Sequence, residues 1–204
     1  MVVLFVLPLF VESYLMHLML LIFFYSYLSC SWNILGGFVG QASIGHAVFF
    51  GIGAYTSSFL FVKYGLSPWI GMFAGGVISA LISTPMGIFM FRYRLRGVYF
   101  SMVTISFAEI ARIISSQLRF IGGNEGLLIP LRGSSIWFYQ FENKQPFYYI
   151  ALVMMLIILW ICHLIRKSKY FYYFSAIRAN EEASAAIGVN TRKYKLIAFV
   201  ISAF

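Results

Sequence analysis

A glycine-rich apolar run near the start of the chain contains three polar side chains that could bind a polar solute. Gln41, Ser43 and His46 lie within residues 34–62, where small residues recur at three- and four-residue spacing. One interpretation is a helix that packs closely against its neighbours in lipid, and the other is a broken helix whose ends meet a substrate near the middle of the membrane. In both cases the polar groups are expected to face a bundle interior or a cavity, because exposure to lipid is costly.

A second polar face is predicted in residues 97–118. Glu109 and Arg112 lie near the middle of this segment and three residues apart, so they share a helix face and can pair. The pair is either a local ion pair that makes membrane insertion tolerable or part of a helix that lines a pathway. We expect it in the bundle interior, because lipid exposure of this face would be unfavourable.

The remaining residues do not assemble into an enzyme site. There are three histidines and no aspartate, so no Ser/His/Asp set or metal cluster can be formed. No Gly-x-x-x-x-Gly-Lys-Ser/Thr loop is present to bind ATP phosphates in the P-loop way. Cys30 and Cys162 lie in apolar stretches and are interpreted as small buried hydrophobic residues. The chain is therefore predicted not to be an enzyme and to hold neither a metal nor a cofactor itself.

The composition places these groups in a membrane protein. Hydrophobic residues make up 61% of the 204 residues and charged residues 10%, against about 25% charged in a soluble domain. A helical crossing needs about 20 mostly apolar residues, and five long apolar segments are present: residues 3–29, 34–62, 69–91, 97–118 and 147–165. A sixth, residues 196–204, is too short to cross. The predicted fold is an all-α polytopic bundle, one transmembrane domain over residues 1–204, with about five full spans and the start of a sixth.

The basic residues orient these spans. Fifteen Lys and Arg against six Glu give a net charge of +9, and ten of the fifteen lie in two loops, residues 92–96 and 166–195. The two loops are separated by two crossings and so share a side, which the positive charge makes the cytoplasm. This explains the basicity without a nucleic-acid partner. The N-terminus is outside if residues 34–62 form one span, whereas a broken or re-entrant segment leaves its side open.

A short alanine-rich helix is predicted at about residues 175–188, inside the cytoplasmic loop 166–195. Ser175 can cap its N-terminus, and Gly188 occupies the C-cap position. The helix is too short and too polar to cross a membrane. It either rests on the lipid headgroups or, because its side chains are small, inserts into a groove of a partner protein.

Four blocks of the sequence resemble a known family. Residues 36–55 contain Gly-Gln-x-Ser-x-Gly-His, and residues 95–110, 122–127 and 175–204 follow, the last with Ala-Ile-Arg-x-Asn-Glu. In type and order these blocks are similar to the M-type permease of high-affinity ABC importers for branched-chain amino acids. The resemblance covers nearly the whole chain, although residues 170–174 are aromatic where the family often has glycine.

The resemblance implies roles for two sets of residues. The family's segment that contacts the ATPases corresponds to Ala176, Ile177, Arg178, Ala179, Asn180, Glu181, Glu182, Ala183, Ala186 and Gly188. The translocation pathway is expected along Gln41, Ser43, His46, Tyr55, Thr104, Glu109 and Asn124.

The resemblance also implies partners. The chain is expected to form half of a translocation pathway with an H-type permease subunit, and to dock two ATPase subunits that hold ATP and Mg²⁺. It would receive leucine, isoleucine or valine from an extracytoplasmic binding protein. Its place would be the inner (plasma) membrane of a bacterium or archaeon, as a multi-pass protein. The family's permeases continue beyond the coupling segment, so the chain is expected to be truncated at its C-terminus.

Two other functions are compatible with these residues. An ion-coupled secondary transporter of small solutes would use Glu109 and His46 as coupling groups. A non-functional permease fragment would transport nothing, because the spans after the coupling segment would be missing.

Overall fold

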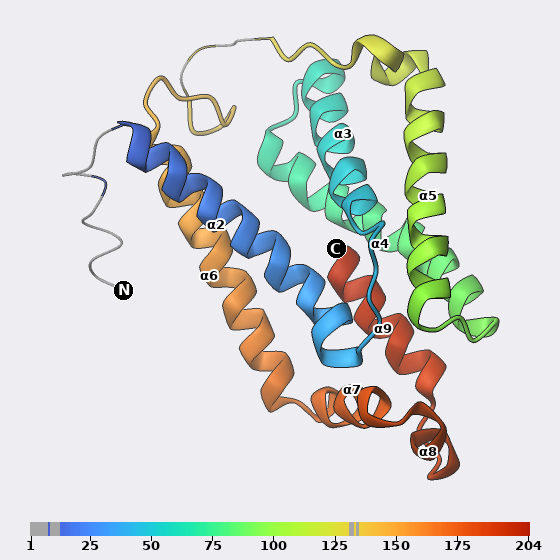
Figure 1. Ribbon diagram of the computed structural model, residues 1–204. Helices are drawn as coiled ribbons and strands as arrows, with labels where there is room; N and C mark the ends of the chain where they lie inside the picture. Colours follow the sequence, from blue (N-terminus) through green and yellow to red (C-terminus); the bar gives the residue numbers. More distant parts are fainter. Residues whose placement is uncertain (1–7, 9–12, 131–132, 134) are drawn as a thin grey trace.

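The computed structural model describes residue 8, residues 13–130, residue 133 and residues 135–204, and these residues form helices joined by loops (Figure 1). In order they are α2 Ser13–Asn33, the π-helix η2 Ile34–Val39, α3 Ala47–Tyr64, α4 Pro68–Arg92, α5 Gly97–Gln117, the 3-10 turns η3 Arg119–Ile121 and η4 Gly123–Glu125, α6 Gln145–Lys167, α7 Lys169–Ala179, α8 Glu181–Ala186 and α9 Thr191–Ala203. The described part of the chain contains no strand, so the predicted all-α fold is confirmed.

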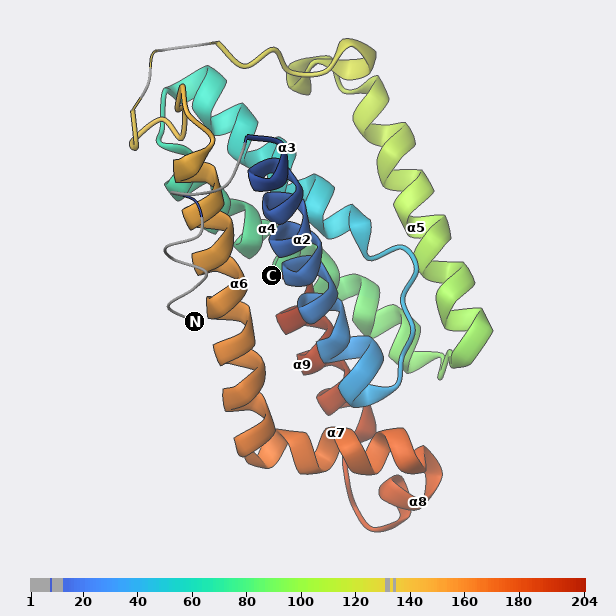
Figure 2. The same ribbon diagram turned by 60° about the vertical axis from the view of Figure 1, so that its left-hand side comes forward.

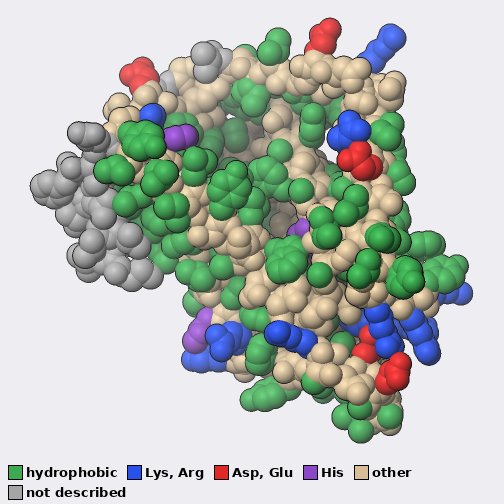
Figure 3. Space-filling model, in the orientation of Figure 1, with side chains coloured by type: hydrophobic (Ala, Val, Ile, Leu, Met, Phe, Trp, Pro, Cys, Tyr) green, Lys and Arg blue, Asp and Glu red, His purple; other side chains and the backbone are tan. Residues whose placement is uncertain are grey.

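Among the described residues, five helices are long and apolar enough to cross a membrane: Ser13–Val39, in which η2 continues α2, and then α3, α4, α5 and α6. They alternate in direction, and the basic loops 92–96 and 166–195 lie together at the lower end in Figures 1 and 2. Figure 3 shows many of the Lys and Arg side chains gathered at this end. The start of α2 lies at the opposite end, with residues 118–130 and 135–144 (Figure 1).

The predicted boundary between the first two spans was wrong. Residues 34–39 continue the first span as η2, and α-helix resumes only at Ala47. The first helix ends at Gly40, whose φ of 78° lies in the left-handed region that favours glycine. The helix break that one interpretation of the glycine-rich run predicted is therefore present at residues 40–46.

The other interpretation, close packing through small residues, holds for α3 and α4. A Cβ atom on Gly75 would overlap the backbone of Gly53, and one on Gly71 would overlap Ser57. Small residues thus bring these two helices close together, as expected where no hydrophobic effect drives helix association.

The short helix α9 lies in the centre of the molecule (Figures 1 and 2). Its Phe199 is fully buried and meets Phe49 of α3, Phe91 of α4 and Phe100 of α5, with ring centroids 5.4, 6.1 and 6.3 Å away, in edge-to-face geometry. A smaller cluster joins α2 to α6, where Phe23 and Tyr148 pack edge to face at 5.2 Å. The main core is therefore built around α9.

Candidate functional site

The first candidate site is the helix break, residues 40–46, between η2 and α3. Gln41, Ser43 and Gly45 are buried, whereas Ala42 and Ile44 between them are exposed. This alternation is that of an extended segment, in which side chains two residues apart share a face. Gln41 and Ser43 therefore point to the same, inner side.

Neighbouring helices supply hydrogen bonds to the unwound backbone of the break. Ser101 of α5 donates to the carbonyl of Ala42 at 2.6 Å, and the backbone N–H of Gly45 donates to Thr104 Oγ1 at 3.4 Å. From α2, Trp32 Nε1 donates to the carbonyl of Ser43 at 2.6 Å. Non-helical backbone at membrane depth is tolerated where such partners exist. Gly45 is required at this contact, because a Cβ atom would overlap the Thr104 carbonyl.

His46 connects the break to α9. Its Nε2 lies 3.1 Å from the carbonyl oxygen of Ser202 and 2.9 Å from Ser202 Oγ, and Ser202 Oγ in turn donates to the carbonyl of Ser31 at 2.6 Å. A carbonyl oxygen can only accept a hydrogen bond, so Nε2 carries the proton. In the neutral ring Nδ1 is then an acceptor.

Three buried polar atoms of the break have no hydrogen-bond partner among the described residues: Gln41 Oε1, Ser43 Oγ and His46 Nδ1. Gln41 is 8% exposed and Ser43 is 3% exposed. Leaving one buried polar group unpaired costs about 1–3 kcal/mol. Three such atoms within six residues make the break the candidate site for binding a polar ligand.

Of the other predicted pathway residues, Thr104 belongs to this site and three lie elsewhere. Tyr55 is on α3 and 38% exposed, and Asn124 is exposed in the turn η4 between α5 and α6. Glu109 and Arg112 form the predicted ion pair, with Arg112 Nε 2.9 Å from Glu109 Oε2. The structure therefore gathers Gln41, Ser43, His46 and Thr104, and not the whole set.

The prediction that the Glu109–Arg112 pair lies in the bundle interior was wrong for this chain. The side chains are 56% and 68% exposed. Arg112 is three helical turns from Ser101 and on the same face, but α5 packs against the break through Phe100, Ser101 and Thr104 near its start. The later turns of α5 stand apart from α3 in Figures 1 and 2, so this polar face is left uncovered by the rest of the chain.

The second candidate site is the ion cluster of Arg96, Glu181, Glu182 and Lys195 at the basic end. Arg96, before α5, lies 2.9 Å from Glu181 Oε2 through Nε and 3.1 Å from Glu182 Oε1 through Nη1. Lys195 of α9 is 2% exposed and pairs with the same Glu181 oxygen at 2.5 Å. Burial lowers the pKa of Lys195, and the adjacent Glu181 carboxylate opposes this effect. The cluster joins α8 to the base of α5 and α9.

The prediction of a single helix at residues 175–188 was wrong, because two helices, α7 and α8, share this range. Ser175 lies inside α7, and the helical chain is interrupted at Asn180, whose φ and ψ of −158° and 107° are extended. The Asn180 side chain caps α8 by accepting from the backbone N–H groups of Glu182 and Ala183, both at 3.0 Å. Gly188, with φ of 92°, ends α8 as predicted, and Val189 N–H reaches the Ser184 carbonyl.

The predicted ATPase-contacting residues divide into two groups. Ile177 is buried, Glu181 is paired within the chain, and Arg178 donates from Nη1 to the carbonyl of Gly37 in η2 at 2.6 Å. The side chains of these residues make contacts within the chain. The exposed group consists of Ala179, Asn180, Glu182, Ala183, Ala186 and Gly188, most of them small. Ile187, which was not among the predicted residues, lies beside them and is 79% exposed.

Several residues at these sites were not identified from the sequence. Ser31 and Ser202 extend the hydrogen-bond chain of His46, and Arg96 and Lys195 pair with the glutamates of α8. They are separated from their partners by up to 171 residues in sequence. Only Ser202 could have been suspected from the sequence, because it is a polar residue in an apolar stretch.

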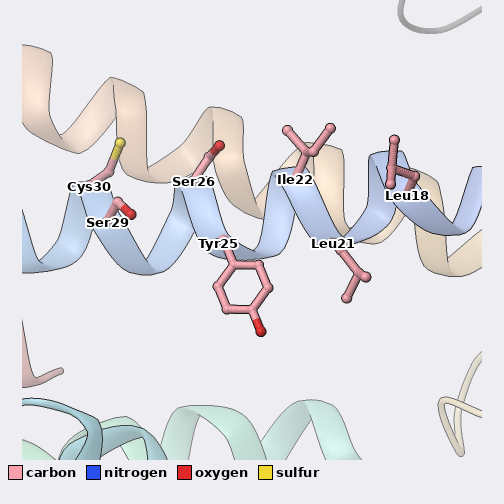
Figure 4. Close-up of a pocket in the computed structure, with 7 residues that line it drawn as sticks. All are labelled: Leu18, Leu21, Ile22, Tyr25, Ser26, Ser29 and Cys30. Carbon is pink, nitrogen blue, oxygen red and sulfur yellow. The ribbon is translucent and has the colours of Figure 1, made fainter.

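An open groove of about 510 Å³ lies along α2, lined by Leu18, Leu21, Ile22, Tyr25, Ser26, Ser29 and Cys30 (Figure 4). Figure 4 shows Leu21 and Tyr25 extending from one side of α2, and Leu18 and Ile22 from the other. No charged group lines this groove, and none of the unpaired acceptors of the helix break does. It has the character of a lipid-facing surface and not of a site for a polar solute.

The spans, the helix break and the basic end together define a polytopic α-helical membrane permease. Residues 14–204 match the family model described as the branched-chain amino acid transport system / permease component, and the chain belongs to this family. It is 29% identical over 202 residues to the high-affinity branched-chain amino acid transport system permease protein LivM of Escherichia coli (strain K12), and equally to LivM of Salmonella typhimurium (strain LT2). In each case the match covers 88% of this chain and 47% of the relative, so the chain spans about half the length of these curated relatives. No solved structure matches it.

Proposed function

We propose that the chain is a permease subunit of an ATP-driven ABC importer for branched-chain amino acids in a bacterial or archaeal plasma membrane. The observation that carries this proposal is the family match over residues 14–204, which includes both the helix break and the ion cluster. The relatives named above are permease proteins of branched-chain amino acid transport. With a second, H-type permease subunit the chain would enclose a translocation pathway, fed by an extracytoplasmic binding protein.

Two separate ATPase subunits would dock on the exposed face of Ala179, Ala183, Ala186 and Ile187. Small side chains suit a helix that inserts into a groove of a partner. The inward side of the same segment, through Glu181 and Arg178, is already paired with α5, α9 and η2. Closure of the ATPase pair on ATP would therefore move the segment together with the helices to which it is bound.

The docking proposal is tested by co-purification of a P-loop ATPase encoded beside the gene. Ala183→Arg places a bulky cation on the exposed face and is expected to abolish retention of the ATPase. Tyr172→Arg is the control, because it places the same cation at an exposed position on α7, outside the proposed docking face. This variant is expected to retain the ATPase. Equal retention by both variants would show that this face does not dock the ATPase.

The transport proposal is tested by uptake of labelled leucine in cells that express the chain with its neighbouring genes. Uptake is expected to stop when ATP is depleted and to survive a protonophore while ATP is maintained. The opposite pattern would favour an ion-coupled secondary transporter. Absence of uptake together with failure of any ATPase to bind would favour a non-functional fragment.

A further inference from the structure

The three unpaired atoms of the helix break form a set of hydrogen-bond acceptors. Gln41 Oε1 is a carbonyl oxygen, and His46 Nδ1 accepts because Nε2 holds the proton for Ser202. Ser43 Oγ can accept as well. The backbone around them is already engaged by Ser101, Thr104 and Trp32, so the acceptors are not consumed by holding the break in place.

The acceptors lie between the end of one helix and the start of the next. The break follows the C-terminal end of the continuous helix Ser13–Val39, which carries partial negative charge, and precedes the N-terminus of α3, which carries partial positive charge and has His46 as its N-cap. Arg178, the cation tied to this segment, donates to the Gly37 carbonyl and packs on Gly40. No carboxylate lies within the break itself. The three unpaired acceptors therefore match a ligand group that offers several N–H donors, and this match rests on hydrogen bonding and not on the charge of the helix ends.

We propose that Gln41 Oε1, Ser43 Oγ and His46 Nδ1 accept the hydrogen bonds of the α-ammonium group of the transported amino acid. The ammonium group has three N–H donors, one for each acceptor. This inference rests on the proposed function and adds to it the part of the substrate that the break recognises. The three atoms are closed off from solvent in this structure, so binding requires that the surrounding helices move apart.

The ammonium group can be tested with the unaltered chain. The chain, purified with its partner subunits in lipid nanodiscs, is incubated with tritiated leucine and two competitors. One is 3-methylbutylamine, which is leucine without its carboxylate, and the other is 4-methylpentanoate, which is leucine without its amino group. We expect the amine to displace leucine at a concentration at least about tenfold lower than the acid, as the loss of hydrogen bonds to a charged group predicts. Equal competition, or better competition by the acid, would overturn the inference.

Variants then test the individual acceptors. Gln41→Met and Ser43→Ala remove an acceptor at similar shape, and His46→Gln keeps a donor for Ser202 while removing Nδ1. Each is expected to weaken leucine binding about tenfold and to leave competition by 4-methylpentanoate unchanged. Ser106→Ala is the control, because the Ser106 hydroxyl bonds to the Met102 carbonyl of its own helix, and it is expected to bind leucine normally. Wild-type affinity in all three site variants would overturn the assignment.

The outcomes separate this inference from the proposed function. If leucine is imported with ATP but the amine does not outcompete the acid, the ammonium assignment is wrong and the importer remains. If the complex neither binds nor imports leucine, the proposed substrate is wrong and the ammonium site is wrong with it.

Discussion

Helices α5 and α9 contrast in length and in burial. α5 has 21 residues and is long and apolar enough to cross a membrane, yet most of its side chains are exposed in this chain. α9 has 13 residues and begins with polar and charged side chains, yet Ala198 and Phe199 are fully buried at the centre of the core. Hydropathy indicates which segments tolerate lipid. It does not indicate which segments hold the molecule together.

The contrast extends to their ion pairs. Glu109 and Arg112 on α5 pair within one helix and remain exposed, whereas Lys195 of α9 is 2% exposed and pairs with Glu181 of α8. An exposed pair contributes little to stability, and removing one partner of a buried pair is costly. Removing one charge of the pair is therefore expected to lower the free energy of unfolding strongly in α9 and only slightly in α5.

The largest effect is expected from Phe199→Ala in α9. Removing a buried ring that meets three other phenylalanines should lower the free energy of unfolding by about 3–5 kcal/mol. Unfolding in detergent titrated with dodecyl sulfate, followed by tryptophan fluorescence, measures the change. Ile113→Ala on the exposed side of α5 is the comparison and should change the free energy by less than about 1 kcal/mol. Similar losses for the two variants would contradict a core built around α9.

A somewhat smaller effect is expected from Lys195→Met. The largely buried Glu181 then keeps Arg96 as its one remaining partner in the cluster, and the free energy of unfolding should fall by about 3 kcal/mol. The same measurement on Arg112→Met should show a change below about 1 kcal/mol, since that pair is exposed. Adding Glu181→Gln to Lys195→Met should recover part of the loss, because no carboxylate then lies near the vacant position. A double variant less stable than Lys195→Met would contradict the proposed pairing.

Gly45→Ala should loosen the attachment of α5 to the rest of the chain. The added Cβ atom would overlap the Thr104 carbonyl, and such overpacking costs about 1–3 kcal/mol. Hydrogen exchange measured by mass spectrometry should show faster exchange in residues 97–105 and no change in α9. Gly51→Ala is the control, since nothing lies within 4 Å of a Cβ at that position. Unchanged exchange in Gly45→Ala would show that α5 is not held at this contact.

The smallest effect is expected from Asn180→Ala, which removes the cap of α8. Loss of a helix N-cap costs about 1 kcal/mol, so exchange in residues 181–187 should increase with little change in overall stability. Asn190→Ala removes the corresponding cap of α9, where Asn190 accepts from the Lys193 N–H at 3.2 Å. Because α9 is buried in the core, its exchange should change less than that of α8. The reverse order would contradict the contrast between a buried α9 and a peripheral α8.

Several features of the site were predicted because they depend on residues close in sequence. Glu109 and Arg112 pair because three residues along a helix share a face. Gly188 ends α8 because a left-handed residue is required there. Gln41, Ser43 and His46 were predicted to face inward from the cost of polar groups beside lipid. Two of them are buried, and His46 binds α9.

The amino-acid sequence by itself determined that this chain is an all-α membrane protein with five spans and two basic loops on one side. Composition, segment length and charge suffice for this, because each acts locally against lipid or water. The tertiary structure alone decided that the first helix breaks at Gly40, that Asn180 separates α7 from α8, and that α9 forms the centre of the core. It also decided the partners of Glu181 and of the unwound backbone. These depend on contacts between residues up to 171 positions apart, and no local pattern specifies which buried group will meet which.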